Sequence, residues 1–234
     1  MSARREEIAA NLDVVRRRIA AAADDAGRNA DEITLVAVTK FFPASDVRLL
    51  ADLGVTDVGE NRHQEAQDKV AQCREVPLRW HFIGGLQSNK AAAVAEYADV
   101  VESVDRGKLL RGLAKGAAQR GRVLDCLVQA SLDPPGQTAA RAGADPRDVP
   151  ALAEAVATTD GLRLRGVMGV APLGGDPARA FADLARIAAE VRLVDPAATW
   201  ISAGMSGDLE QAIRAGATHV RIGSAVLGDR PAIK

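Results

Sequence analysis

Lys40 stands at the end of a strongly apolar segment, LVAVTKFFP at residues 35–43. A lysine at the end of a buried strand can simply reach solvent. In a pocket, however, loss of hydration favours the neutral amine, which is a nucleophile toward carbonyl carbons. The segment therefore leaves two interpretations open, a solvated lysine and a reactive amine, and residues elsewhere in the chain must decide between them.

Two turns rich in glycine and serine could bind an anion. Ser206 and Gly207 precede a predicted helix in SAGMSGDLEQAI, and Gly223 and Ser224 follow a predicted strand in RIGSAVLG. Free backbone N–H groups, hydroxyls and a helix N-terminus all favour phosphate, although either turn alone is more often just a helix cap. The two turns together with Lys40 are a more specific indication of a binding site. Pyridoxal 5'-phosphate (PLP) needs both a phosphate site and a lysine that forms a Schiff base with its aldehyde.

The elements that position these residues alternate between strands and helices. An N-terminal helix comes first, because apolar residues recur there at helical spacing from Ile8 to Ile19. Each later apolar segment of strand length is followed by a helical pattern. The expected strands are 33–40, 56–61, 79–84, 99–104, 122–131, 162–171, 199–205 and 218–224. Eight parallel strands joined by helices close most simply into a barrel.

The predicted fold class is therefore α/β, a single-domain (β/α)8 TIM-type barrel with an extra N-terminal helix, spanning residues 1–234. A doubly wound open sheet is the alternative. It would place G-x-G-x-x-G after the first strand, where this chain has TKFFPAS. In such barrels phosphate is often held after strands seven and eight, where the two turns lie. The glycine- and proline-rich loop at 131–145 has no role that the sequence assigns.

Composition excludes several other classes of protein. A formal net charge of -1 argues against a nucleic-acid-binding protein. No apolar run approaches the ~18 residues that predict a membrane span, and the amphipathic N-terminus is unlike a secretory signal. Cys73 and Cys126 form no C-x-x-C motif, which is typical of reduced thiols in the cytoplasm. No cluster of His, Cys and Asp has the spacing of metal ligands.

Five motifs resemble, in order along the chain, signatures of the YggS-type pyridoxal phosphate homeostasis proteins. They are AVTKFFP, VGENRHQEAQDK, WHFIGGLQSNK, SAGMSGDLEQAI and VRIGSAVLG. The resemblance implies a barrel like the N-terminal domain of bacterial alanine racemase, with PLP bound covalently at Lys40. It also implies a pyridine nitrogen that faces Arg221 and a phosphate held by Ser206, Gly207, Gly223 and Ser224. The chain departs from the family at Arg62, where Tyr is frequent, and at Gly85, where His is frequent.

Two polar residues near the predicted pocket have alternative interpretations. Arg221 alternates with two apolar neighbours, so we expect it to face the barrel interior, where it could face the cofactor or form an ion pair with Glu60 or Glu102. Asn61 ends the second predicted strand and could contact the cofactor ring, although an Asn before a helix is often its N-cap.

A lysine and the histidines carry weaker signals. Lys90 follows LQSN and could hold a carboxylate inside the barrel, or it could be solvated. His81, alone within a strand, is more typical of a hydrogen-bonded core residue than of a participant in chemistry. His63 and His219 have no acidic partner at useful spacing, so the sequence assigns them no role.

Two classes of function use such a pocket. One is a PLP-binding protein of intracellular PLP homeostasis, which carries the cofactor without strong catalysis. The other is a PLP-dependent amino-acid racemase. Racemisation in this fold needs a second acid/base group, which a C-terminal domain of the partner subunit supplies in alanine racemase. Here the chain ends at GDRPAIK, and its only tyrosine, Tyr97, lies in a predicted helix.

A third class, an isomerase that acts on a phosphorylated metabolite, would not need Lys40 and would need a Glu/His pair that the sequence does not place. We therefore expect a cytoplasmic, monomeric, non-catalytic PLP-binding protein. Its candidate partners are amino acids and PLP-dependent apo-enzymes. The sequence predicts neither nucleic-acid nor membrane binding.

Overall fold

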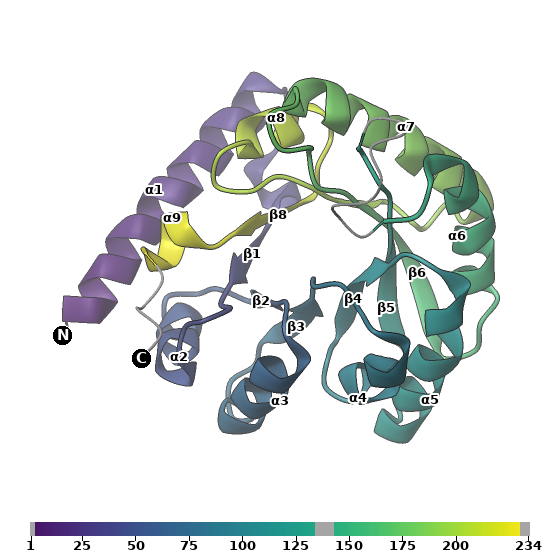
Figure 1. Cartoon of the computed structure of the whole chain (residues 1–234). Helices are drawn as coiled ribbons and strands as arrows, with labels where there is room; N and C mark the ends of the chain where they lie inside the picture. The colour runs from purple at the N-terminus through teal and green to yellow at the C-terminus, as the bar shows by residue number, and fades with distance from the viewer. Residues whose placement is uncertain (1–2, 134–142, 230–234) are drawn as a thin grey trace.

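The computed structural model describes residues 3–133 and 143–229, in which eight strands form one closed parallel barrel in chain order (Figure 1). The strands are β1 Thr34–Val38, β2 Asp57–Glu60, β3 Arg79–Phe82, β4 Val100–Val104, β5 Leu124–Gln129, β6 Leu162–Met168, β7 Trp200–Ser202 and β8 His219–Ile222. β1 pairs with both β2 and β8, which closes the barrel. The predicted fold class is confirmed, and each predicted strand is present in a shorter form.

Helices follow the strands and surround the barrel. They are α1 Ala3–Asp25, α2 Ala44–Asp52, α3 His63–Gln72, α4 Ala91–Ala95, α5 Leu110–Arg120, α6 Val149–Ala157, α7 Pro177–Val194, α8 Leu209–Arg214 and α9 Ser224–Leu227. Three predicted helices begin later than the pattern indicated, because a short 3-10 turn precedes each of α4, α5 and α6. No helix of the described residues is long and apolar enough to cross a membrane.

Apolar side chains fill the layer between the strands and the helices, whereas the inside of the barrel is unusually polar. Barrel interiors of this class are usually filled by branched apolar side chains. Here Glu102 of β4 accepts a hydrogen bond from Ser202 of β7 at 2.6 Å. β4 and β7 are not neighbours in the barrel, so this bond crosses the interior.

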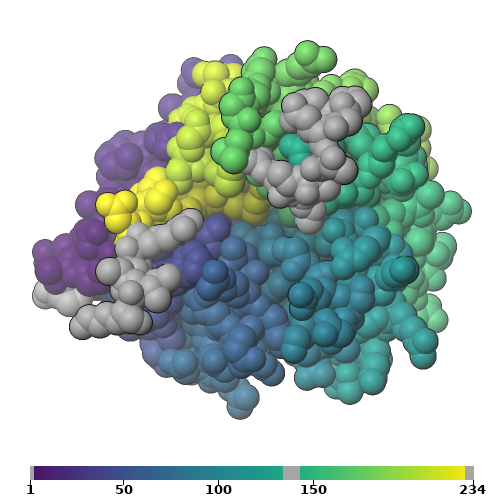
Figure 2. All heavy atoms as spheres, in the orientation of Figure 1, coloured from purple at the N-terminus to yellow at the C-terminus, as the bar shows by residue number. Residues whose placement is uncertain are grey.

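The N-terminal helix α1 lies outside the barrel against its last elements. It packs on α8 and α9 (Figure 1), and the space-filling view shows the C-terminal segment in yellow resting against the purple helix (Figure 2). The apolar face predicted from Ile8, Leu12, Val15 and Ile19 is buried in this contact. The helix therefore supports the part of the barrel that carries Ser206 and Ser224.

Candidate functional site at the C-terminal mouth of the barrel

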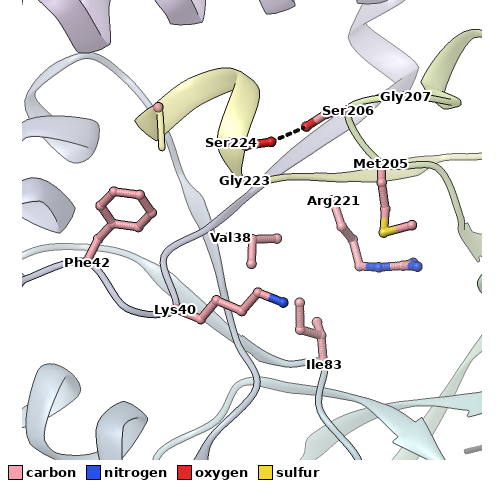
Figure 3. A pocket seen from close by; sticks show the side chains of 11 residues that line it. Val38, Lys40, Phe42, Ile83, Met205, Ser206, Gly207, Arg221, Gly223 and Ser224 are labelled. Carbon is pink, nitrogen blue, oxygen red and sulfur yellow. Dashed lines mark hydrogen bonds between the residues drawn. The ribbon is translucent and has the colours of Figure 1, made fainter. Parts of the chain in front are cut away.

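A cavity of about 280 Å³ lies where the strands end, and six of the seven predicted site residues line it. Figure 3 shows the amine of Lys40 and the guanidinium of Arg221 extending into this cavity, with Ser206 and Ser224 on its far side. The lining residues are Val38, Lys40, Phe42, Ile83, Met205, Ser206, Gly207, Arg221, Gly223, Ser224 and Gly228. Residues from the two ends of the chain thus meet in one cavity.

The two serine turns lie side by side. Ser224 Oγ donates to Ser206 Oγ at 3.5 Å, and the backbone N–H of Ala225 donates to the same oxygen at 3.4 Å. A Cβ placed on Gly207 would meet nothing within 4 Å, so the backbone is open to the cavity there. A Cβ on Gly223 would lie 3.5 Å from Val38. The turns therefore present hydroxyl and N–H donors to one small volume.

Helix α1 binds backbone carbonyl groups of the Ser206 turn and of the end of α9, the helix that begins at Ser224. Arg18 donates to the carbonyl oxygen of Ser206 at 3.0 Å and pairs with Glu210 at 2.7 Å. Arg4 donates to the carbonyl oxygen of Leu227 at 2.9 Å, and Asn11 to that of Val226 at 3.1 Å. These bonds use carbonyl acceptors only, so helix α1 takes up none of the hydroxyl and N–H donors of the turns.

Lys40 lies two residues beyond the end of β1, in a turn rather than in the strand as predicted. The turn is tightly defined on both sides of the lysine. Thr39 donates its backbone N–H to the carbonyl oxygen of Gly59 at 3.0 Å. Phe41 has φ 71°, the only positive φ of a non-glycine residue in the described segments. Such a conformation persists only where surrounding contacts impose it.

A buried ionic cluster imposes that conformation. Lys69 of α3 donates to the carbonyl oxygen of Thr39 at 2.8 Å and pairs with Glu60 at 2.5 Å and Glu65 at 3.0 Å. Glu60 also accepts from Thr39 Oγ1 at 2.6 Å, and Glu65 accepts the backbone N–H of Phe41 at 2.5 Å. Both residues that flank Lys40 are therefore bound to one cluster, which we call the lysine clamp (Glu60, Glu65 and Lys69).

The sequence analysis missed the lysine clamp, although part of it could have been predicted. Glu65 and Lys69 stand four residues apart, the spacing of an ion pair on one helix face. Nothing local shows that Glu60 and Lys69 are buried, with side chains only 1% and 5% exposed. Burial raises the pKa of Glu60, against the lowering effect of Lys69. Lys69 is thus the cation that this buried carboxylate requires.

Arg221 is buried inside the barrel, as predicted; the ion pair is present, whereas contact with the cofactor stays a prediction. Its guanidinium lines the cavity, and it also lies 3.8 Å from Glu102. It donates to Ser202 Oγ at 2.7 Å and to the carbonyl oxygen of Gly169 at 3.0 Å. The acidic partner is Glu102 rather than Glu60. Burial lowers the pKa of Arg221, but a guanidinium stays cationic at neutral pH.

Behind Arg221, a chain of hydrogen bonds continues through the barrel. Glu102 contacts His81 Nδ1 at 2.7 Å, and His81 Nε2 contacts Asp57 at 2.8 Å. Burial by itself would lower the pKa of His81, but the bonds to Asp57 and Glu102 raise it to about 9. Burial would likewise raise the pKa of Glu102, yet His81 and Arg221 bring it to about 2. His81 is the hydrogen-bonded core residue that its sequence context predicted.

The remaining predicted positions lie outside the cavity lining. Asn61 does not line it and does not cap α3, whose N-cap is Arg62; Asn61 Oδ1 is buried and has no hydrogen-bond partner among the described residues. Lys90 is exposed in a 3-10 turn, so it does not hold a carboxylate inside the barrel. Lys90 ends the 3-10 turn that directly precedes α4, one of the helices outside the barrel, and it is exposed to solvent there.

The two departures from the family pattern lie at the surface. The guanidinium of Arg62 stacks on the ring of Phe41, 4.8 Å from its centroid, and so covers the turn that carries Lys40. Gly85 is exposed. Of the loop at 131–145, residues 134–142 lie outside the described residues. The described residues contain no group of His, Cys, Asp and Glu that could hold a metal ion.

Comparison with known proteins identifies the family. The sequence model of the protein family called alanine racemase, N-terminal domain, matches residues 5–231. The chain belongs to this family. It is 40% identical to the pyridoxal phosphate homeostasis protein of Mycobacterium tuberculosis, over 97% of this chain and 94% of that protein. It is 41% identical to the protein of the same name from Pseudomonas aeruginosa, over 95% of this chain and 96% of that protein.

A solved structure extends the similarity to the fold. PipY of Synechococcus elongatus, determined with PLP bound, superposes with a TM-score of 0.80 at 33% identity. The superposition covers 94% of this chain and all of PipY (100%). The resemblance stated from five sequence motifs is therefore confirmed over nearly the whole chain.

Proposed function

We propose that the chain binds PLP at the C-terminal mouth of the barrel and acts in PLP homeostasis. One observation carries the proposal. A single cavity brings together an amine, a buried guanidinium and two serine turns, from Lys40, Arg221, Ser206 and Ser224. The names of the relatives and the PLP in the PipY structure support it. A location in the cytoplasm and a monomeric state remain predictions.

The residues present fit the cofactor in charge and chemistry. When bound, PLP supplies an aldehyde that condenses with an amine, and Lys40 would hold it as a Schiff base. The hydroxyls of Ser206 and Ser224, with the backbone at Gly207 and Gly223, would bind the phosphate. Charge-assisted hydrogen bonds of this kind are the strong ones. Arg221 would face the pyridine nitrogen and, as a cation, would not protonate it. Asn61 is a further candidate contact to the ring.

We further propose that the protein is not a proficient catalyst. PLP stabilises negative charge best when its ring nitrogen is protonated, and a carboxylate beside that nitrogen favours protonation. Arg221 has the opposite effect, and the Ser202 and Glu102 contacts keep it in place. Among the described residues that line the cavity, Lys40 carries the only side chain suited to act as a general base at a substrate carbon. Positioned acid/base groups typically contribute ~100- to 10,000-fold in rate.

Reduction and peptide mapping test the attachment. Borohydride treatment of the PLP-loaded protein should fix pyridoxyl on the peptide that contains Lys40, and Lys40→Ala should lose the absorption band of the bound cofactor. Lys69→Arg, which keeps the charge of the lysine clamp, should leave the label on Lys40. A label found mainly on Lys69, Lys90 or Lys108 would contradict the assignment.

Isotope exchange tests the absence of strong catalysis. The PLP-loaded protein should change its absorption with L-amino acids, because exchange of one amine for another needs no carbanion. It should not incorporate solvent deuterium at Cα at a useful rate. Turnover of ~1 per second or faster, within the ordinary range of enzymes and lost in Lys40→Ala, would instead favour the racemase alternative.

A further inference from the structure

A second cavity, of about 420 Å³, lies at the opposite end of the barrel, where the strands begin. Arg79 starts β3, Arg122 lies two residues before β5, Arg163 is in β6, and Trp200 starts β7. Because the strands are parallel, their N-terminal ends meet at one mouth. This cavity shares no lining residue with the one that contains Lys40.

Guanidinium groups outnumber carboxylates in this cavity. Two aspartates, Asp99 and Asp125, line it together with four arginines, after which we call it the arginine cleft. The four are Arg79, Arg122, Arg163 and Arg165. Asp125 alone is approached by Arg163 at 2.5 Å, by Arg79 at 3.3 Å and by Arg165 at 4.0 Å. One carboxylate cannot neutralise three guanidinium groups.

The other nearby carboxylates do not restore the balance. Asp99 pairs with Arg120 at 2.8 Å, outside the cleft lining, and only then with Arg122 at 3.5 Å. Asp57 lies 3.8 Å from Arg79, but it is bound more closely to His81, at 2.8 Å. If these charged residues served only to stabilise this end of the barrel, the numbers of guanidinium and carboxylate groups would be expected to be equal. The excess of positive charge instead leaves room for a further anion.

Three of the arginines are accessible to solvent, and two of the four lie against the ring of Trp200. The side chains of Arg122, Arg163 and Arg79 are 64%, 55% and 43% exposed, so their guanidinium groups reach solvent. Arg165 lies 4.2 Å and Arg79 5.1 Å from the ring centroid of Trp200, which orients both planes. Arg165 Nε is buried and has no hydrogen-bond partner among the described residues. Its nearest carboxylate oxygen, of Asp125, lies 4.0 Å away, so Asp125 leaves this guanidinium incompletely paired.

We propose that the arginine cleft binds a compact anion that carries two or more phosphate or carboxylate groups. The planar fork of arginine matches both groups in bidentate geometry. Two groups are needed because the exposed arginines project from β3, β6 and the segment before β5. The inference is independent of the proposed PLP site, which lies at the other mouth.

Calorimetry at an ionic strength of ~0.15 M tests the proposal, because exposed charges are screened there. The PLP-loaded protein, in which the phosphate site at Ser206 and Ser224 is occupied, is titrated with pyrophosphate and, separately, with citrate. We expect one saturable site per chain for at least one anion; the tighter of the two identifies phosphate or carboxylate as the preferred group. Arg163→Gln with Arg165→Gln should weaken binding about tenfold or more, since each arginine contributes charge-assisted bonds.

Two controls separate this site from other causes. Arg186→Gln removes an exposed arginine of α7 that pairs with Asp183 and lies outside the cleft, so binding should not change. Ser206→Ala with Ser224→Ala alters the other mouth and should leave binding unchanged. If the double arginine variant does not fold, Arg122→Gln replaces it. No saturable binding of either anion, or equal weakening in Arg186→Gln, would overturn the proposal, as would unchanged binding in the arginine variants.

Discussion

The turn that carries Lys40 and the turns that carry Ser206 and Ser224 face the same cavity, but different contacts hold them. The lysine clamp binds the Lys40 turn through a buried ion pair, Lys69 with Glu60, whose side chains are at most 5% exposed. Helix α1 binds the Ser206 turn and the end of α9 through partly exposed side chains; that of Arg18 is 32% exposed. One side of the site is held from within the protein and the other from its surface.

The difference follows from what each side has to present. A single amine must point in one direction, which requires a fixed backbone, including the left-handed φ of Phe41. An anion site instead needs several free donors. Contacts from Arg4, Asn11 and Arg18 to carbonyl oxygens do not occupy the N–H and hydroxyl groups of the turns. The contrast predicts large effects on the lysine side and smaller ones on the surface side.

The largest effect is expected from Lys69→Met. The variant leaves the Glu60 carboxylate buried without its cation, and breaking such a pair typically costs about 3 to 5 kcal/mol. We expect a loss of this size in the free energy of unfolding, measured in urea, together with slower attachment of PLP to Lys40.

The matched control for that variant removes both charges. Glu60→Gln with Lys69→Met should recover much of the lost stability, because no fully buried charge is left unpaired and Thr39 can still donate to the amide oxygen. Glu65 also loses Lys69, but its side chain is 25% exposed and it still accepts the backbone N–H of Phe41. If the double variant is as unstable as the single one, the ion pair is not what holds the turn.

The next effect concerns the serine turns. Ser206→Ala or Ser224→Ala should weaken PLP binding by about 1.5 to 3 kcal/mol each, the contribution of a hydrogen bond to a charged group. Pyridoxal, which lacks the phosphate, should lose much less affinity in the same variants. Ser88→Ala, in an exposed turn, serves as the control. Equal losses for PLP and pyridoxal would show that the turns do not bind the phosphate.

A pH-dependent effect is expected from the chain of hydrogen bonds behind Arg221. The pKa of His81 is raised from 6.5 to about 9 in the folded protein. The folded state therefore binds a proton that the unfolded state releases, so this stabilisation is complete below pH 6.5 and is lost as the pH rises toward 9. Urea unfolding from pH 6 to 9 should show this decline, and His81→Gln should flatten it. An unchanged slope in the variant would assign the decline to other groups.

The smallest effect is expected from Arg18→Ala. It removes one hydrogen bond to Ser206 and a partly exposed ion pair with Glu210, which together contribute about 0.5 to 1.5 kcal/mol. PLP should dissociate a few-fold faster, while attachment to Lys40 is unaltered. Arg17→Ala is the control, because Arg17 is 68% exposed and pairs with Asp13 on the same helix. A larger loss in Arg18→Ala than in Lys69→Met would reverse the comparison.

The fold could be predicted because its signals are local. Apolar segments of strand length alternate with helical periodicity, and this rhythm repeated eight times determined a barrel with an N-terminal helix. The strand ends were less accurate, because the same apolar residues continue past the last barrel hydrogen bond. Lys40 therefore belongs to a turn and not to β1. Lys90 could not be placed, since a lysine after a strand is compatible with either the interior or the surface.

The sequence by itself determined the barrel, the Lys40 amine and the two serine turns, because these depend on residue type and on order along the chain. Only the tertiary structure decided what surrounds them. The lysine clamp joins β1 to α3, Glu102 reaches Ser202 across the barrel, and the arginine cleft gathers residues from several strands. Each contact depends on which side chains the closed barrel buries together. Burial of a charged group changes its electrostatic energy far more than the residues next to it in the sequence do.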